Sequence, residues 1–162
     1  MQILPLLFDH WPAVKAIYES GLATGHASFQ TSAPSWEEWD AAHLKHSRLI
    51  AIRDNQVLAW AALTPVSGRC VYAGVAEVSV YVDAESRGQG LGEQLLQALI
   101  EESEANGLWT LQAGIFPENI ASLKIHEKTG FRQVGVRERI GQMNGIWRNT
   151  VLLERRSKTV AI

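Results

Sequence analysis

A glycine-rich segment separates a predicted strand from a predicted helix, and its sequence is Arg87-Gly88-Gln89-Gly90-Leu91-Gly92. Glycines at the start of a helix leave backbone N–H groups unpaired and let a ligand approach them closely. The positive end of the helix dipole adds to the attraction for an anion. The segment therefore predicts a site for a phosphate or pyrophosphate. A flexible turn that binds nothing is the alternative, and three glycines behind an arginine disfavour it.

Two familiar phosphate-binding loops do not match this segment. A dinucleotide-binding loop has its third glycine three residues after the second, and Glu93 occupies that position here. A nucleoside triphosphate loop has Gly-Lys followed by Ser or Thr, which the segment lacks. The ligand is therefore expected to be a phosphate compound of another kind.

Two titratable residues near this segment have types suited to proton transfer. Glu77 lies in a strand rich in valine, and burial there would raise the pKa of its carboxyl toward values useful for a base. His126 follows Asn119 on a short predicted helix, and an imidazole titrating near neutrality can donate a proton or polarise water. The alternatives are a half-exposed strand glutamate and a packed helix histidine.

The elements that must position these residues follow from hydrophobic periodicity. Apolar residues alternate in a strand over Val75–Val82, and a helical stripe then runs from Leu91 toward Asn106. Further strands are predicted at Gln2–Leu7, Arg48–Arg53, Val57–Pro65, Trp109–Ile115, Phe131–Arg139 and Ile146–Leu153, with a turn over Gly141–Gly145. Further helices are predicted from near His10 to Gly21, from Trp36 to about Leu44, and over Ile120–Thr129.

This order predicts an α/β (α+β) sandwich with one largely antiparallel sheet and helices on both faces. The helix that ends at Asn106 should connect two parallel neighbouring strands with right-handed sense. At 162 residues the chain is expected to form a single domain over 1–162, in which 155–162 is a solvated tail.

Composition restricts the class of protein. A formal net charge of −2 gives no reason to expect a nucleic acid or an anionic membrane as partner. No segment approaches the roughly 18 apolar residues of a membrane span, and the first residues do not resemble a signal peptide. A single cysteine, Cys70, excludes an internal disulfide and a cysteine zinc site. We expect a cytoplasmic protein without a metal.

The glycine segment resembles the Q/R-x-x-G-x-G/A signature of the GNAT superfamily of acetyl-CoA-dependent N-acetyltransferases. The wider sequence is most similar to the phosphinothricin and methionine sulfoximine N-acetyltransferase branch. The motifs that carry this resemblance are Phe29-Gln30-Thr31, Pro34-Ser35-Trp36-Glu37-Glu38-Trp39, Arg69-x-x-Tyr72, Ala76–Val82, Asn119-x-x-Ser122-x-x-x-His126-Glu127-Lys128-x-Gly130-Phe131 and Gly145-Ile146-Trp147. One departure is Asn149, where branch members often have aspartate.

The resemblance implies a GNAT-like fold, acetyl-CoA as co-substrate and a homodimer. It implies that Glu77 is the general base, and that His126 stands where much of the superfamily has the tyrosine thought to protonate the departing thiolate. It also implies that the coenzyme contacts the strand, the glycine segment and the next helix cap, namely Val80, Val82, Arg87, Gly88, Gln89, Gly90, Leu91, Gly92 and Asn119.

The acceptor site is expected upstream of Glu77. Arg69 offers a guanidinium fork that suits a carboxylate or phosphinate, and Tyr72 can add a hydrogen bond. Phe29 and Trp36 are candidates for pocket walls, although plain core aromatics explain them equally well. His43 and His46 have helical metal spacing without a nearby third ligand, so they are read as a solvated helix end.

The leading hypothesis is an enzyme that acetylates the α-amine of a small amino acid or analogue, by direct attack within a ternary complex. Two alternatives remain open at this point. One is a protein or peptide N-terminal acetyltransferase, which needs an open groove. The other is a coenzyme-binding sensor without catalysis, which would not need Glu77 or His126.

Overall fold

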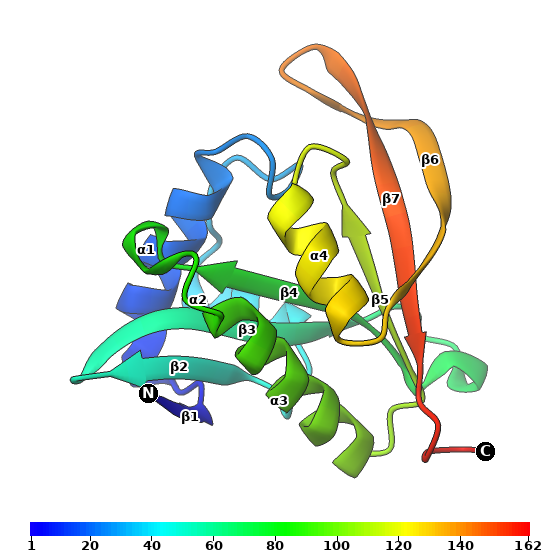
Figure 1. The fold of residues 1–162 in the computed structure, drawn as a ribbon, viewed down its shortest axis with the longest axis horizontal. Helices are drawn as coiled ribbons and strands as arrows, with labels where there is room; N and C mark the ends of the chain where they lie inside the picture. Colours follow the sequence, from blue (N-terminus) through cyan, green and yellow to red (C-terminus); the bar gives the residue numbers. More distant parts are fainter.

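A seven-stranded sheet forms the centre of the structure, a computed structural model that describes residues 1–162 (Figure 1). Its strand order is β1-β2-β3-β4-β5-β7-β6. Only β4 and β5 are parallel, and every other neighbouring pair is antiparallel, as the sequence predicted. The strands are β1 Gln2–Pro5, β2 Leu49–Arg53, β3 Gln56–Pro65, β4 Val75–Val82, β5 Thr110–Ile115, β6 Arg132–Met143 and β7 Ile146–Arg156.

Four helices cover the two faces of the sheet (Figure 1). They are α1 Trp11–Leu22, α2 Trp36–Ala42, α3 Leu91–Ala105 and α4 Ile120–Lys128. The aromatic side chains of α1 and α2 form one core with Trp60 and Ile50, while the leucines of α3 form the other with Val78 and Leu153. No helix has the length and apolar content that crossing a bilayer requires. Short 3₁₀ turns lie at Phe8–His10, Cys70–Tyr72 and Ala84–Ser86.

Helix α3 forms the crossover between β4 and β5. Gly90 precedes it with a φ of 77°, in the left-handed region that glycine adopts without strain. The helix then buries one side, formed by Leu91, Leu95, Leu96, Leu99 and Ile100. Because this stripe packs under β3 and β4, the crossover holds the glycine segment at the end of β4.

Strand β6 extends beyond the predicted boundary at Arg139, which is wrong by four residues. The expected turn over Gly141–Gly145 is only the two residues Asn144 and Gly145, whose φ values of 51° and 79° suit a tight hairpin. A bulge interrupts the pairing of β6 with β7 between Arg137 and Gly141. The hairpin projects beyond the body of the protein (Figure 1).

Asn149 holds the bulge in β6. Its Oδ1 accepts a hydrogen bond of 2.8 Å from the backbone N–H of Arg139, which has a φ of 48°. A carboxylate oxygen at the same place would accept the same bond. The departure from the aspartate common in the branch therefore leaves this contact in place.

The expectation of a solvated tail over 155–162 is wrong for its first half. Arg155 and Arg156 belong to β7, and Ser157 is buried. Arg155 donates a hydrogen bond of 2.7 Å to Glu104, and Thr159 donates one of 3.1 Å to the same carboxylate. These contacts attach the end of the chain to α3.

Candidate active site

Strands β4 and β5 separate in the middle of the sheet. Their pairing ends at Glu77 and Gln112, although β4 continues to Val82 and β5 to Ile115. In an antiparallel ladder alternate residues point their backbone groups away from the partner. Every second residue of β4 beyond Glu77 therefore directs its N–H and C=O toward the gap, where they can bind a ligand as a missing strand would.

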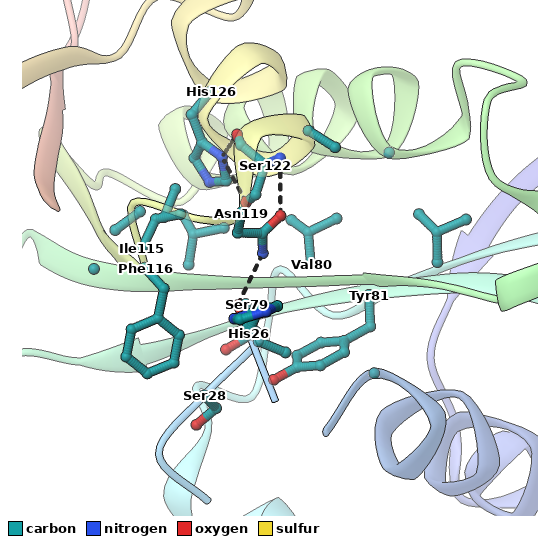
Figure 2. Close-up of a pocket in the computed structure, with 18 of the residues that line it drawn as sticks. His26, Ser28, Ser79, Val80, Tyr81, Ile115, Phe116, Asn119, Ser122 and His126 are labelled. Atoms are coloured by element: carbon teal, nitrogen blue, oxygen red, sulfur yellow. Dashed lines mark hydrogen bonds between the residues drawn. The ribbon is translucent and has the colours of Figure 1, made fainter. Parts of the chain in front are cut away.

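A cavity of about 1440 Å³ surrounds this gap. Pockets that enclose one small ligand usually have about 300–1,000 Å³, so this cavity has room for two molecules. It is lined on one side of β4 by the glycine segment and α4, and on the other by Glu77, Tyr81 and the segment between α1 and α2. Figure 2 shows the two sides, with His126 on α4 across the strand from Tyr81 and His26.

The glycine segment has the geometry expected of an anion site. Gly88 and Gly90 have φ values of 79° and 77°, and the first hydrogen bond of α3 runs from the N–H of Gln94 to Gly90. The preceding N–H groups of the first turn have no partner within the helix. At Gly92 a Cβ atom would lie 3.2 Å from Cδ1 of Ile125, so the missing side chain lets α4 pack close to this turn.

The predicted coenzyme residues line the cavity with one exception. They are Val80, Val82, Arg87, Gly88, Gly90, Leu91, Gly92 and Asn119. Gln89 is the exception, because its side chain turns away and accepts a hydrogen bond of 3.0 Å from Arg53.

Glu77 lies at the point where the two strands separate and lines the cavity. Its carboxylate accepts a hydrogen bond of 3.1 Å from Nε2 of Gln112, the residue opposite it on β5. The side chain is exposed in this structure, so the expectation of a buried carboxyl is wrong. The physical reason is that alternate β4 side chains face different sides, and Ala76, Val78, Val80 and Val82 are the ones that face the leucine core.

His126 is buried on α4, with 3% of its surface exposed. Its Nδ1 lies 2.7 Å from the carbonyl oxygen of Ser122, so the neutral ring carries its proton on Nδ1. Its Nε2 is an acceptor without a hydrogen-bond partner. Burial lowers the pKa of His126 below its ordinary value and so favours the neutral ring.

Asn119 connects α4 to the segment between α1 and α2. Its Oδ1 accepts a hydrogen bond of 3.3 Å from the N–H of Ser122 and so caps α4, as predicted. Its Nδ2 donates a bond of 3.2 Å to the carbonyl oxygen of His26 (Figure 2). This single amide therefore fixes the distance between the two walls of the cavity.

Arg148 on β7 also contacts both of these cavity walls. Its guanidinium donates hydrogen bonds to the carbonyl oxygen of Gly25, to Nδ1 of His26 at 3.0 Å and to Glu118 at 3.2 Å. It also lies over the ring of Phe116, with Cζ 3.7 Å from the centroid. An arginine is always a donor, so His26 accepts this bond at Nδ1. No local motif marks Arg148, because these partners come from two segments that are distant from it in sequence.

The predicted acceptor-pocket residues divide between two places. Phe29 lines the cavity, and its ring packs against Phe116 and over Gly141, where a Cβ atom would lie 2.7 Å from Phe29 Cζ. Trp36 does not line the cavity. It packs with Trp11 and Trp39 in the aromatic core.

Arg69 and Tyr72 lie outside the large cavity, so the structure does not join them to Glu77. Both are exposed, and the Arg69 guanidinium lies 5.5 Å from the centre of the Tyr72 ring. The intervening Cys70 is also exposed. His43 is not a solvated helix end either, because it stacks on Trp39 at 4.1 Å and burial lowers the pKa of its imidazole.

Two curated relatives have similar sequences. Phosphinothricin N-acetyltransferase of Alcaligenes faecalis is 37% identical over 153 residues, which cover 91% of this chain and 78% of the relative. The L-methionine sulfoximine/L-methionine sulfone acetyltransferase of Pseudomonas aeruginosa is 42% identical over 83 residues, which cover 51% of this chain and 48% of the relative. Both belong to the branch that the sequence motifs indicated.

Two solved structures share the fold over nearly the whole chain. Ribosomal-protein-alanine N-acetyltransferase from Brucella melitensis has a TM-score of 0.88 and 28% identity, covering 97% of this chain and 100% of that one. The yncA structure from Salmonella typhimurium has a TM-score of 0.90 and 24% identity, covering 100% and 96%. The model of the Acetyltransferase (GNAT) family matches residues 11–131. The chain is an acyltransferase that belongs to the GNAT family, in the branch of the phosphinothricin and methionine sulfoximine N-acetyltransferases.

Proposed function

We propose that the protein transfers the acetyl group of acetyl-CoA to the α-amine of a small amino acid of the phosphinothricin or methionine sulfoximine type. The observation that carries this proposal is the single cavity that joins the glycine segment to Glu77 through the gap between β4 and β5. The proposed transfer is a direct attack, which is supported by a cavity with room for two molecules and no cysteine in its lining. The Alcaligenes and Pseudomonas relatives support this acceptor class.

The coenzyme occupies the glycine side of the cavity. Its pyrophosphate accepts hydrogen bonds from the free N–H groups between Gly88 and Gly92, at the positive end of α3. Its pantetheine arm lies in the gap beside Val80 and Val82 and pairs with the unpaired backbone groups of β4. The fold neighbour from Salmonella, which was solved with its cofactor acetyl-CoA, supports this arrangement.

Glu77 acts as the base. It accepts a proton from the acceptor amine, directly or through one water, while the amine attacks the thioester carbonyl. Backbone N–H groups of β4 that face the gap stabilise the oxyanion of the tetrahedral intermediate. Collapse of the intermediate forms the amide and expels the coenzyme thiolate, which takes a proton from water to become the free thiol, and Glu77 returns its proton to solvent. Neutral His126 places its free Nε2 on the coenzyme side, where it accepts a hydrogen bond from a water molecule.

The Brucella neighbour makes N-terminal acetylation of a protein the second candidate. A panel of acceptors assayed with acetyl-CoA decides between the two, with free thiol as the readout. We expect turnover with phosphinothricin, methionine sulfoximine and methionine sulfone, and little with a peptide that begins with alanine. The reverse order would establish the second candidate. Absence of turnover with every acceptor, together with binding of acetyl-CoA, would indicate a sensor.

We also propose that the protein is a homodimer formed through the β6–β7 hairpin. This hairpin exposes large apolar side chains that a monomer would leave in water, namely Val134, Val136, Ile140, Ile146 and Trp147. Trp147 is half exposed, and aromatic residues of this kind are enriched at interfaces. Substitution of Trp147 by glutamate should therefore shift the mass measured by light scattering from dimer toward monomer.

A further inference from the structure

The arginines and lysines that line the large cavity belong to different sides of the sheet. On the coenzyme side, Arg87 precedes the glycine segment, and Lys124 and Lys128 lie one turn apart on α4. Nζ of Lys128 lies 3.8 Å from Glu93 in the first turn of α3, which places this group beside the proposed pyrophosphate site. These charges suit the phosphates of the coenzyme. They do not provide a cation for an anionic group of the acceptor.

Arg137 on β6 is a cation on the acceptor side. Glu77 pairs with Gln112 on β5, and Gly114, two residues further along β5, faces the same side. Gly114 pairs with Leu152 on β7, and the same face of β7 carries Thr150, the partner of Arg137. The register therefore places Arg137 and Glu77 on one face, and both line the cavity.

The Arg137 guanidinium has no salt bridge or hydrogen bond within the chain, although its side chain lines the cavity. Arg148, two positions from Thr150 on the same face of β7, already donates to Gly25, His26 and Glu118. Arg148 is therefore a structural cation, and Arg137 is available for a ligand.

The bulge in β6 fixes the position of Arg137. It begins directly after Arg137, where the pairing with β7 shifts, and the bond between Asn149 and Arg139 holds it. Bulges bend a strand and redirect its side chains, and they are frequent beside active sites. Gly141 follows the bulge and lies under Phe29. The bulge therefore positions both the guanidinium of Arg137 and the contact with the Phe29 ring.

We infer that Arg137 binds an oxygen-rich anionic group on the side chain of the acceptor, with the hydroxyl of Thr150 as an additional donor. This inference rests on the proposed function and names the group that selects its substrate. The strand order puts β4 three strand spacings from β6, about 14 Å across the sheet, and Arg137 pairs with Thr150, four positions along β7 from the row of Glu77. An acceptor whose amine lies at Glu77 therefore meets Arg137 with a group well beyond its α-carbon. A phosphinate or distal carboxylate suits the paired donors of a guanidinium.

Steady-state kinetics on four proteins test this inference. They are the wild type, Arg137→Ala, Arg137→Lys and the control Arg132→Ala on the same strand, whose side chain is exposed and does not line the cavity. Phosphinothricin, with its anionic phosphinate, is compared with methionine, whose side chain has no oxygen. Arg137→Ala should raise the KM for phosphinothricin about 10- to 100-fold, as expected for loss of a charge-assisted bond, with a smaller change in kcat. The KM for methionine should stay unchanged in Arg137→Ala, and the KM for either substrate should stay unchanged in the control.

Direct binding separates this inference from the proposed function. Phosphinothricin is titrated calorimetrically into each protein saturated with coenzyme A. Binding by the wild type that weakens in Arg137→Ala, without turnover, supports the inference and overturns the function. Turnover with an unchanged KM in Arg137→Ala, or an equal rise for methionine, overturns the inference alone. Absence of binding to the wild type overturns both. Partial recovery in Arg137→Lys, which lacks the paired donors, supports the guanidinium contact.

Discussion

Gln112 on β5 donates a hydrogen bond of 3.1 Å from its Nε2 to Oε1 of Glu77 on β4, at the last paired position before the two strands separate. The bond leaves the second carboxylate oxygen free for a substrate or a water. Because the pair also marks the start of the gap, the same position that ends the sheet pairing orients the proposed base. Sequence alone gives no sign of this contact, since the residues are 35 positions apart.

Glu77→Gln should lower kcat about 100- to 10,000-fold, the usual contribution of a general base. The change keeps the shape of the side chain, so the affinity for acetyl-CoA should stay the same. Thiol release measures the rate, and calorimetry measures the affinity. Glu101→Gln is the matched control, because Glu101 is an exposed residue of α3 outside the cavity. A Glu77→Gln enzyme with nearly normal turnover from pH 6 to 9 would contradict the assignment.

Gln112→Ala should have a smaller effect than loss of the base itself. A single hydrogen bond contributes about 1 kcal/mol, which corresponds to a loss of roughly 5-fold in kcat. The test is the kcat of the double variant. If Gln112 acts only through Glu77, adding Gln112→Ala to Glu77→Gln should cause no further loss of kcat. A fully additive effect would show that Gln112 has a separate role.

The local part of the site was predictable from the sequence. The strand that ends at Val82, the glycine segment and the helix that follows have short-range patterns, and the structure confirms all three. The cap at Asn119 was predictable for the same reason. The hairpin turn at Asn144 and Gly145 was missed although Asn-Gly is a strong turn signal, because Gly141 and Gly145 together suggested a longer loop.

The rest of the site depends on contacts between distant segments. Arg137 could not be selected from sequence, because its place on the same face of the sheet as Glu77 depends on the register across four strands and on a bulge. Arg69 was selected because it is close to Glu77 in sequence, and the structure places it outside the cavity. The exposure of Glu77 likewise depends on which face of β4 is covered.

Gly90→Val should abolish binding of acetyl-CoA. A β-branched residue is strained at a φ of 77°, and its side chain would also obstruct the approach of the pyrophosphate to the N–H groups of α3. Gly107→Val is a matched control, because Gly107 has a φ of 83°, has open space around it and lies at the other end of the same helix. Both variants should lose similar stability, and only Gly90→Val should lose binding in calorimetry. Equal affinities would contradict the loop assignment.

The stability of the protein should decrease as the pH falls below about 6.5, partly through His126. Burial lowers the pKa of this imidazole in the folded state below its ordinary value of 6.5. The unfolded chain therefore binds more protons in the window below 6.5, and the free energy of unfolding falls with pH there. Urea unfolding at pH 5, 6, 7 and 8 measures this dependence. In His126→Gln the free energy of unfolding should depend less strongly on pH. Part of the dependence should remain, because burial also lowers the pKa of His43. An unchanged dependence would contradict the prediction.

Arg148→Ala should weaken acceptor binding and stability together. The side chain is only 13% exposed and holds both His26 and Gly25, so its loss frees the wall between α1 and α2. We expect kcat/KM for the acceptor to fall about 5- to 50-fold, corresponding to roughly 1–2 kcal/mol of lost hydrogen bonding. Glu118→Gln should have little effect, since that carboxylate is 55% exposed and solvent-exposed ion pairs contribute little.

Arg156→Ala separates positioning by Arg148 from a general loss of stability. Arg156 lies on the same strand and donates hydrogen bonds to the carbonyl oxygens of Val160 and Ala161, outside the cavity. Its removal should lower the thermal midpoint without changing the KM for the acceptor, whereas Arg148→Ala should change both. Kinetics are measured at a temperature where every variant is folded. If Arg148→Ala lowers only the midpoint, the contacts to His26 and Gly25 stabilise the fold and do not position the acceptor.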